Sequence, residues 1–132
     1  MQYEQTSNDI TIRVEVDYVP PEAHGHGPGQ HVWAYHITML NAGGDIVRLK
    51  TRHWDIMDGN GRLHVVDGEG VVGETPVLKP NQSFSYSSGC PLPTQSGSMS
   101  GWYMFERDDG AAIKVLVPAF SLDLPDARRV LN

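Results

Sequence analysis

The sequence predicts an all-β protein that folds as an antiparallel sandwich of about seven strands. Apolar residues recur at every second position in several short segments, which is the period of a strand with one buried face. Glycine, proline, asparagine and aspartate separate these segments at short, regular intervals. No segment shows a convincing amphipathic helical pattern, so we expect sheets alone to make the core.

Two alternating segments come first, separated by a loop. Residues 10–18 place isoleucine, valine or tyrosine at every even position, and residues 33–39 place tryptophan, tyrosine, isoleucine and methionine at every odd position. Between them, residues 20–29 (PPEAHGHGPG) are rich in structure-breaking residues and predict a loop. The first strand also carries three charged side chains that we expect to blunt a sheet edge: Arg13, Glu15 and Asp17.

The third predicted strand, residues 46–57, changes its buried face partway along. The apolar pair that ends at Leu49 stands at odd positions, whereas the pair that begins at Trp54 stands at even positions. We therefore expect a β-bulge near residues 51–53. The sequence DGNG at residues 58–61 then predicts a hairpin, because both Asp-Gly and Asn-Gly supply the positive φ angles that tight turns require.

The second half of the chain supplies the remaining strands. Aromatic residues at 84–86, the segment 99–105 and alternating branched residues at 113–117 each indicate a strand. Asp108-Asp109-Gly110 predicts the hairpin between the last two. We expect Pro118-Ala119-Phe120 to close the final strand.

About seven short antiparallel strands are typical of an immunoglobulin or fibronectin type III-like sandwich, and we expect one domain over residues 1–132. We expect residues 123–132 to be a polar, frayed tail with at most a short helix. The single cysteine, Cys90, leaves no internal disulfide to join the sheets, so aromatic packing must join them. The expected core consists of inward-facing side chains of these strands: Ile12, Val14, Tyr35, Ile37, Leu49, Trp54, Phe84, Tyr86, Tyr103, Val115 and Phe120.

Charge and composition argue against several classes of function. The chain carries ten basic residues against sixteen acidic ones, a formal net charge of −6. The basic residues are spread out, apart from a cluster at Arg48, Lys50 and Arg52, so we expect no nucleic-acid binding. No apolar run is long enough to cross a membrane, and the first ten residues lack the pattern of a signal peptide. Together with the lone cysteine, these features predict a cytoplasmic protein.

Residues 68–73 show the G-x-G-x-x-G spacing of phosphate-binding loops. A dinucleotide-binding fold needs a helix that starts at those glycines, but prolines at 76 and 80 forbid one. The loop therefore belongs to a β protein, and two interpretations are open. Its backbone N–H groups form an anion-binding nest, or its glycines allow a tight bulged turn in which Val71 and Val72 enter the core.

An anion site here would combine the loop with Arg52 and His53, whose side chains can grip a carboxylate or a phosphate. Glu69 and Glu74 would repel phosphate and favour the purely structural interpretation. In that interpretation Arg52 is an ordinary outward strand residue beside a buried Trp54. The predicted anion-binding set is Gly68, Gly70, Gly73, Arg52 and His53.

The remaining chemistry-bearing residues predict neither a cofactor nor catalysis. His24 and His26 are candidates for metal binding, but their loop would have to be ordered, so we expect adventitious binding and no metal site. Cys90 has no surrounding signature of a reactive thiol. Residues 97–101 (GSMSG) miss the nucleophile motif G-x-S-x-G because Met99 is central. We therefore predict that the protein is not an enzyme.

Six segments together resemble the bacterial ApaG family over almost the whole chain. They are W-A-Y-H-I-T-M-L-N at 33–41, V-R-L-K-T-R-H-W at 47–54, G-E-G-V-V-G-E-T-P at 68–76, F-S-Y-S-S-G at 84–89, G-S-M-S-G-W-Y at 97–103 and P-A-F-S-L at 118–122. Two positions depart from the family pattern. Asn81 stands where glycine is usual, and asparagine also adopts left-handed backbone geometry. Trp33 replaces a more usual phenylalanine and keeps the aromatic ring.

The resemblance implies a fibronectin type III-like sandwich without established catalytic residues. The bacterial proteins are linked by name and phenotype to cobalt resistance and magnesium efflux. Related domains in some eukaryotic F-box proteins and in a polymerase-delta-interacting protein look like protein-interaction modules. Without a membrane span, we expect any role in efflux to be indirect.

We therefore expect a module that binds a protein partner through an exposed strand edge, or through the loops after Tyr18 and around residues 68–76. Exposed edges would also permit self-association. The alternatives are a small-anion or nucleotide sensor that uses residues 68–73, and a divalent-metal sensor that uses His24 and His26.

Overall fold

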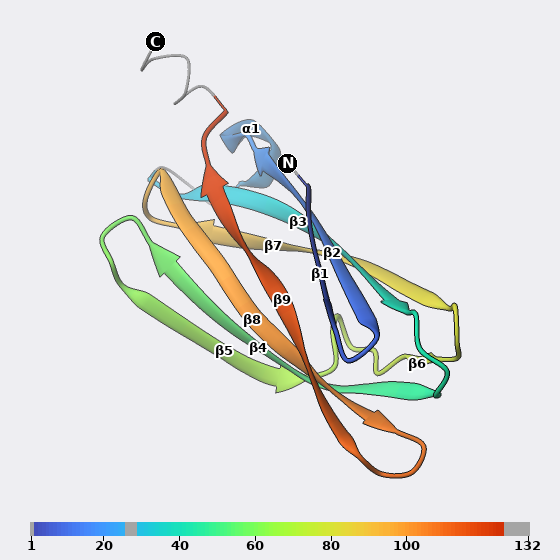
Figure 1. The fold of residues 1–132 in the computed structure, drawn as a ribbon. Helices are drawn as coiled ribbons and strands as arrows, with labels where there is room; N and C mark the ends of the chain where they lie inside the picture. The colour runs from blue at the N-terminus through green and yellow to red at the C-terminus, as the bar shows by residue number, and fades with distance from the viewer. Residues whose placement is uncertain (1, 26–28, 126–132) are drawn as a thin grey trace.

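The computed structural model describes residues 2–25 and 29–125, which form two antiparallel sheets packed face to face (Figure 1). Sheet A contains, in spatial order, β1 (Gln2–Ser7), β2 (Ile10–Val19), β3 (His31–Asn41) and β7 (Ser83–Leu92). Sheet B contains, in spatial order, β5 (Leu63–Glu69), β4 (Val47–Asp58), β8 (Ser96–Arg107) and β9 (Ala112–Asp123), and the short β6 (Val77–Leu78) also pairs with β4. A one-turn helix, α1 (Pro21–His24), lies between β2 and β3. The predicted antiparallel sandwich is confirmed.

The described residues form nine strands, because β1 and β6 add to the seven expected. β1 has one large apolar side chain, Tyr3, so its sequence shows no alternation; it is a strand because it pairs with β2 over all six residues. This pairing places β2 inside sheet A. The expectation of an exposed sheet edge is therefore wrong at Arg13 and Glu15, whereas Asp17 lies beyond the residues that pair with β1. Arg13 instead forms an ion pair with Glu4 of β1 at 2.9 Å.

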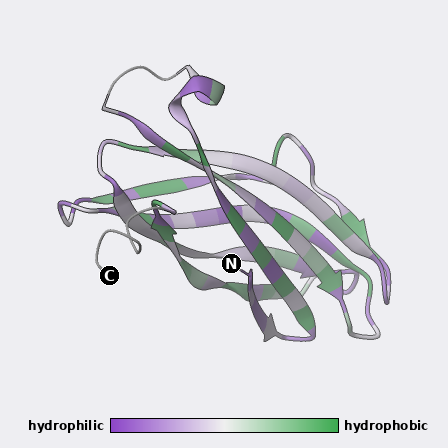
Figure 2. Ribbon diagram, turned by 90° about the horizontal axis from the view of Figure 1, so that it is seen from above, coloured by the Kyte–Doolittle hydropathy of each residue, from purple (hydrophilic) through white to green (hydrophobic). Residues whose placement is uncertain are grey.

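Alternating side chains of both sheets fill the interior, as the strand periodicity predicted. Hydrophobic and hydrophilic residues alternate along the strands in Figure 2. The expected core residues are buried except Phe84, which is half-buried and packs against the core. Near the centre, the ring of Trp54 meets those of Tyr35, Tyr103 and Phe120 edge-on. Tyr35 belongs to sheet A and the other three rings to sheet B, so these aromatic contacts join the two sheets without a disulfide.

A β-bulge in β4 changes its buried face, as predicted. The register with β8 shifts between Leu49 and Thr51, slightly before the expected position. Leu49 and Trp54 are consequently both buried, although one lies at an odd and the other at an even position. The hairpin predicted at residues 58–61 is also present. Of its two glycines, Gly61 alone has a positive φ, +81°, so the expectation that both supply one is wrong.

β9 continues through the residues that were expected to close it. Its register with β8 shifts opposite Pro118 and Ala119, and such a bulge accommodates a proline that has no N–H to give to the ladder. The strand extends to Asp123, and Leu124 packs against the core. Residues 126–132 of the expected tail lie outside the described part of the chain, so its fraying stays a prediction.

The loop predictions hold in part. Residues 20–25 contain α1, a helical turn that was not expected. Asn81 takes a φ of +68°, which confirms the left-handed geometry expected there. The hairpin at residues 108–110 is confirmed, with Gly110 at φ +90° and its N–H donating to the Arg107 carbonyl at 2.9 Å.

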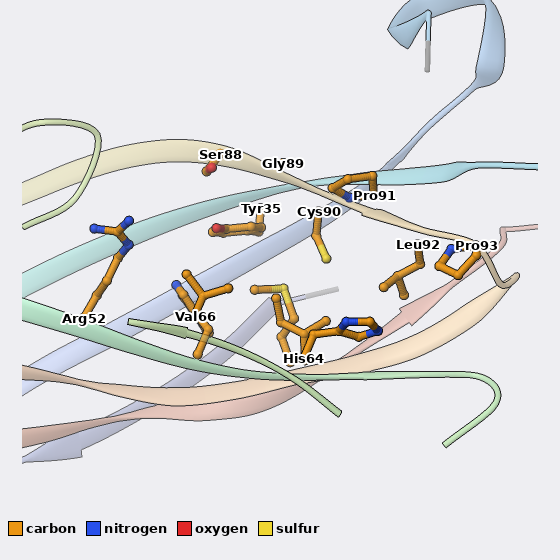
Figure 3. Close-up of a pocket in the computed structure, with 13 residues that line it drawn as sticks. Tyr35, Arg52, His64, Val66, Ser88, Gly89, Cys90, Pro91, Leu92 and Pro93 are labelled. Atoms are coloured by element: carbon orange, nitrogen blue, oxygen red, sulfur yellow. The ribbon is translucent and has the colours of Figure 1, made fainter. Parts of the chain in front are cut away.

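The two sheets are joined along one side and open along the other. On the joined side, the side-chain amide of Asn8 donates to the Lys114 carbonyl at 2.8 Å, and the ring of Tyr3 packs against Phe120. On the open side, β5 and β7 are the free edges of their sheets. A cleft lies between these two strands (Figure 3).

Candidate functional site

The glycine loop forms a tight turn after β5. Val71 and Glu74 exchange two backbone hydrogen bonds, of 2.9 and 2.8 Å. Between them, Val72 and Gly73 have φ angles of +43° and +81°, the two consecutive positive values of a type I′ turn. Val71 is fully buried, as expected. Val72 is 59% exposed, so the expectation that it enters the core is wrong; it stands at the tip of the turn.

The N–H groups of Gly70 and Val71 are already engaged within the protein. The Gly70 N–H donates to the Lys50 carbonyl at 2.9 Å, beside the β4 bulge. A Cβ at Gly70 would lie 2.2 Å from the Glu74 carbonyl oxygen, so the turn itself requires glycine at this position. Gly68 lies within β5, where no turn is made. Anion binding through Gly68, Gly70 and Gly73 stays a prediction, and it would depend on donors other than the Gly70 N–H.

Arg52 is the side chain that the structure brings to the glycine loop. Its Nη1 donates to the carbonyls of Glu69 and Gly70, at 2.9 Å each. Its guanidinium lies against Gly68, where a Cβ would come within 2.7 Å of Nη1. Arg52 is half-buried and lines the cleft, so it is not an ordinary outward strand residue. Arg52, Gly68 and Gly70 of the predicted set are therefore neighbours.

His53 takes no part in this group, because it points to the outer face of sheet B. Its ring is stacked on Trp102, its Nδ1 lies 2.6 Å from Asp67 Oδ1, and its Nε2 lies 3.0 Å from Asp55 Oδ1. The hydrogen bond with Asp67 is the main cause of a raised His53 pKa; burial opposes the rise, and Asp55 adds to it. Arg52 and His53 thus lie on opposite faces of sheet B.

The cleft between β5 and β7 has a volume of about 410 Å³. Its floor is apolar and includes Trp54 and Met99. Arg52 stands at one end, and the hydroxyl of Tyr35 points towards it (Figure 3). Burial raises the pKa of Tyr35, and a hydrogen bond with Ser88 and the charge of Arg52 counteract part of that rise. The cleft therefore joins an apolar floor to a polar, positively charged end.

Sequence reasoning missed this cleft because its lining comes from five strands that are distant in the chain. These are β3, β4, β5, β7 and β8, and no spacing in the sequence links them. One signal was available in β5, where Val65 and Val66 place apolar side chains on both faces of one strand. Only one face of an edge strand can pack against the core. An apolar side chain on the opposite face therefore indicates a second apolar surface.

Of the other candidate groups, the structure describes His24 in α1 and Cys90 in β7. His24 ends α1, and His26 lies outside the described residues. In the described part of the chain, no three His, Cys, Asp or Glu side chains gather as metal ligands would. Burial raises the pKa of the Cys90 thiol to about 11, which disfavours the nucleophilic thiolate. No described helix has the length and apolarity needed to cross a bilayer.

Large apolar side chains are exposed along the hairpin of β4 and β5. Leu63 and Val65 are 53% and 54% exposed, and Met57 is 37% exposed. Met57 pairs with Leu63, and Val65 stands two residues further along β5, so all three side chains lie on the outer face of sheet B. We call these three residues the edge strip. The edge strip and the cleft lie on opposite faces of the same free strand.

Comparisons with known proteins agree with the fold and extend over most of the chain. The family model described as the ApaG domain matches residues 21–107. The curated Protein ApaG of Bradyrhizobium sp. (strain ORS 278) is 47% identical over 130 residues, which cover 98% of this chain and 99% of that protein. The Protein ApaG of Afipia carboxidovorans is 48% identical over the same shares of the two chains.

Solved structures show the same similarity. The crystal structure described as the putative ApaA protein from Bordetella pertussis superposes with a TM-score of 0.82 at 39% identity, over 89% of this chain and 94% of that one. The X-ray structure of another structural-genomics target superposes with a TM-score of 0.84 at 35% identity, over 91% and 90% of the two chains.

Proposed function

The chain belongs to the ApaG family, and from this premise we propose that it is a non-catalytic β-sandwich module that binds another protein through the edge strip. The observation that carries the proposal is the exposure of Met57, Leu63 and Val65 beside a free sheet edge. Clustered exposed apolar side chains are typical of interaction sites. A free edge strand also offers unpaired backbone N–H and C=O groups to an added strand.

The charges around the edge strip favour a protein partner over a nucleic acid. Asp55 lies directly opposite Val65 across the β4–β5 pair, and Asp67 follows two residues later on β5. The whole chain has a formal net charge of −6. Even with a charged His53 ring between them, the two carboxylates leave a net negative charge that would repel a phosphate backbone. A strand that carries apolar and basic side chains would complement both the strip and its surroundings.

A pull-down with purified variants tests this proposal. Leu63→Glu combined with Val65→Glu places two charges in the strip, and we expect it to abolish saturable capture of a protein that the wild type binds. Val72→Glu is the control, because Val72 is equally exposed but stands on the glycine turn. A partner retained by the double variant, or lost with Val72→Glu, would place binding elsewhere; the absence of any saturable partner would contradict a binding module.

Binding of a small anion or of a nucleotide pyrophosphate at residues 68–73 is the second function we propose. One observation favours it: two hydrogen bonds hold the Arg52 guanidinium against this loop. Pyrophosphate titration, followed by amide NMR, tests it. Shifts confined to residues 68–73 and lost in Arg52→Met would support the loop site, and no shift at millimolar pyrophosphate would remove it.

We further propose that residues 1–132 act as one domain in the cytoplasm, with an indirect part in cobalt and magnesium homeostasis. The family resemblance supports the metal link, and the lone cysteine supports the location. Calorimetry with Co²⁺ on the wild type and on a His24→Ala, His26→Ala double variant tests direct metal binding. Self-association through the free edges is tested by sedimentation of the wild type and of the Leu63→Glu, Val65→Glu variant.

A further inference from the structure

We infer that the cleft between β5 and β7 binds a small organic monoanion, a carboxylate with an apolar body, whose head group pairs with Arg52. This site is distinct from the edge strip, which lies on the other face of β5. It is also distinct from an anion nest in the glycine loop, because the ligand's body would lie between the two sheets. Its volume of about 410 Å³ falls within the range of roughly 300–1,000 Å³ that holds small organic ligands.

The lining of the cleft selects for an apolar body. Trp54, Ile56 and Met99 supply apolar lining. Val66 and Leu92 also line the cleft (Figure 3). Trp54 and Met99 are 3% and 1% exposed and are fixed by core packing. A preformed apolar wall of this kind binds alkyl or aromatic groups without reorganising, so the protein loses little conformational entropy on binding.

The charge of the lining selects for an anion. Among the residues that line the cleft there is no aspartate or glutamate, although the chain as a whole is acidic. Arg52 takes part in none of the ion pairs formed by the described residues. A guanidinium that borders an apolar space without a carboxylate partner is complementary to an anionic ligand.

The orientation of Arg52 selects for a carboxylate. Within the described residues, Arg52 donates hydrogen bonds from Nη1 to the carbonyls of Glu69 and Gly70. They fix the guanidinium and leave Nε and Nη2, two parallel donors that match the two oxygens of a carboxylate. The Tyr35 hydroxyl points towards the same end and offers a third polar contact (Figure 3).

Binding of octanoate, compared with neutral octanol and with inorganic phosphate, tests the inference. The readouts are calorimetry and the NMR shifts of the Trp54 indole and the Met99 methyl group. We expect octanoate to shift both signals and to bind at least tenfold more tightly than octanol, while phosphate leaves them unshifted. Equal affinity for octanoate and octanol would overturn the role of Arg52, and phosphate binding as tight as octanoate binding would overturn the role of the apolar floor.

Adjacent residues of β5 supply a matched pair of variants. Val66→Glu places a carboxylate in the cleft, where it should pair with Arg52 and abolish octanoate binding. Val65→Glu adds the same charge on the opposite face of the strand and should leave octanoate affinity unchanged. Arg52→Met should weaken octanoate binding at least tenfold. If this substitution unfolds the glycine loop, the comparison of Val66→Glu with Val65→Glu tests the site instead. Equal effects of these two variants would overturn the site.

Discussion

The imidazole of His53 lies flat against the indole of Trp102, with ring centroids 3.9 Å apart and 11° between the ring planes. The two residues face each other across β4 and β8. Both imidazole nitrogens have a carboxylate oxygen within 3.0 Å, from Asp67 and from Asp55. A neutral imidazole can donate from one nitrogen only, whereas an imidazolium donates from both, so this arrangement favours the charged ring.

We predict that His53 stabilises the folded protein in a pH-dependent way. The folded state raises the His53 pKa above its ordinary value of 6.5, so the folded protein holds this proton more tightly than the unfolded chain does. The stabilisation is complete below pH 6.5 and is lost as the pH rises through the raised pKa. Urea unfolding at several pH values should therefore show that the difference in free energy between wild type and His53→Gln shrinks as the pH rises.

NMR titration of the His53 ring separates the two carboxylates. Because the Asp67 hydrogen bond is the largest cause of the rise, Asp67→Asn should lower the pKa of His53 more than Asp55→Asn does. A wild-type His53 that titrates at or below 6.5 would contradict the geometry, as would an effect of His53→Gln that grows with pH.

Most of the fold could be predicted because a strand with one buried face shows alternating apolar and polar residues in its own sequence. Ile12 and Ile37 alternate with polar neighbours, and both are fully buried. β1 could not be predicted, since Tyr3 alone carries its apolar signal and the strand exists through its pairing with β2. Pro118 led to the wrong end for the last strand for a related reason. A bulge, which depends on the pairing of two strands, allows β9 to continue through this proline.

Trp54→Ala should be among the most destabilising core substitutions. The ring is 3% exposed and contacts aromatic rings from both sheets, so its removal leaves a large cavity. We expect a loss of about 3–5 kcal/mol in the free energy of unfolding, measured with urea. Trp102→Ala is the control, because that ring lies on the outer face and leaves no interior cavity; a larger loss for Trp102 would contradict the placement of Trp54.

The two positive-φ glycines of the loop should respond differently to alanine. Gly70 and Gly73 have φ angles of +59° and +81°, so both substitutions carry the backbone cost of the left-handed region, roughly 1 kcal/mol. At Gly70 the new Cβ would also meet the Glu74 carbonyl oxygen, whereas at Gly73 it meets no atom within 4 Å. Gly70→Ala should therefore lower the melting temperature clearly more than Gly73→Ala. Equal effects would show that the turn is not built as described.

The candidate site was less predictable than the fold, because it depends on which side chains converge. Arg52 was singled out from its sequence neighbourhood, and it does lie against Gly68. His53, its neighbour in sequence, faces the other side of the sheet. The sequence could not place Tyr35 beside Arg52, since these residues belong to different sheets and meet only when the sandwich closes.

The hydroxyls of Tyr86 and Tyr103 should show strong energetic coupling. They form a hydrogen bond of 2.6 Å between the two sheets, and burial raises both pKa values, so the pair stays protonated at any ordinary pH. Replacing one tyrosine with phenylalanine leaves the other hydroxyl buried without this partner, which costs about 1–3 kcal/mol. Replacing both removes the unsatisfied group, so the double variant should lose clearly less stability than the sum of the single losses. Urea denaturation of the four proteins measures this coupling, and additive losses would show that the two hydroxyls do not depend on each other.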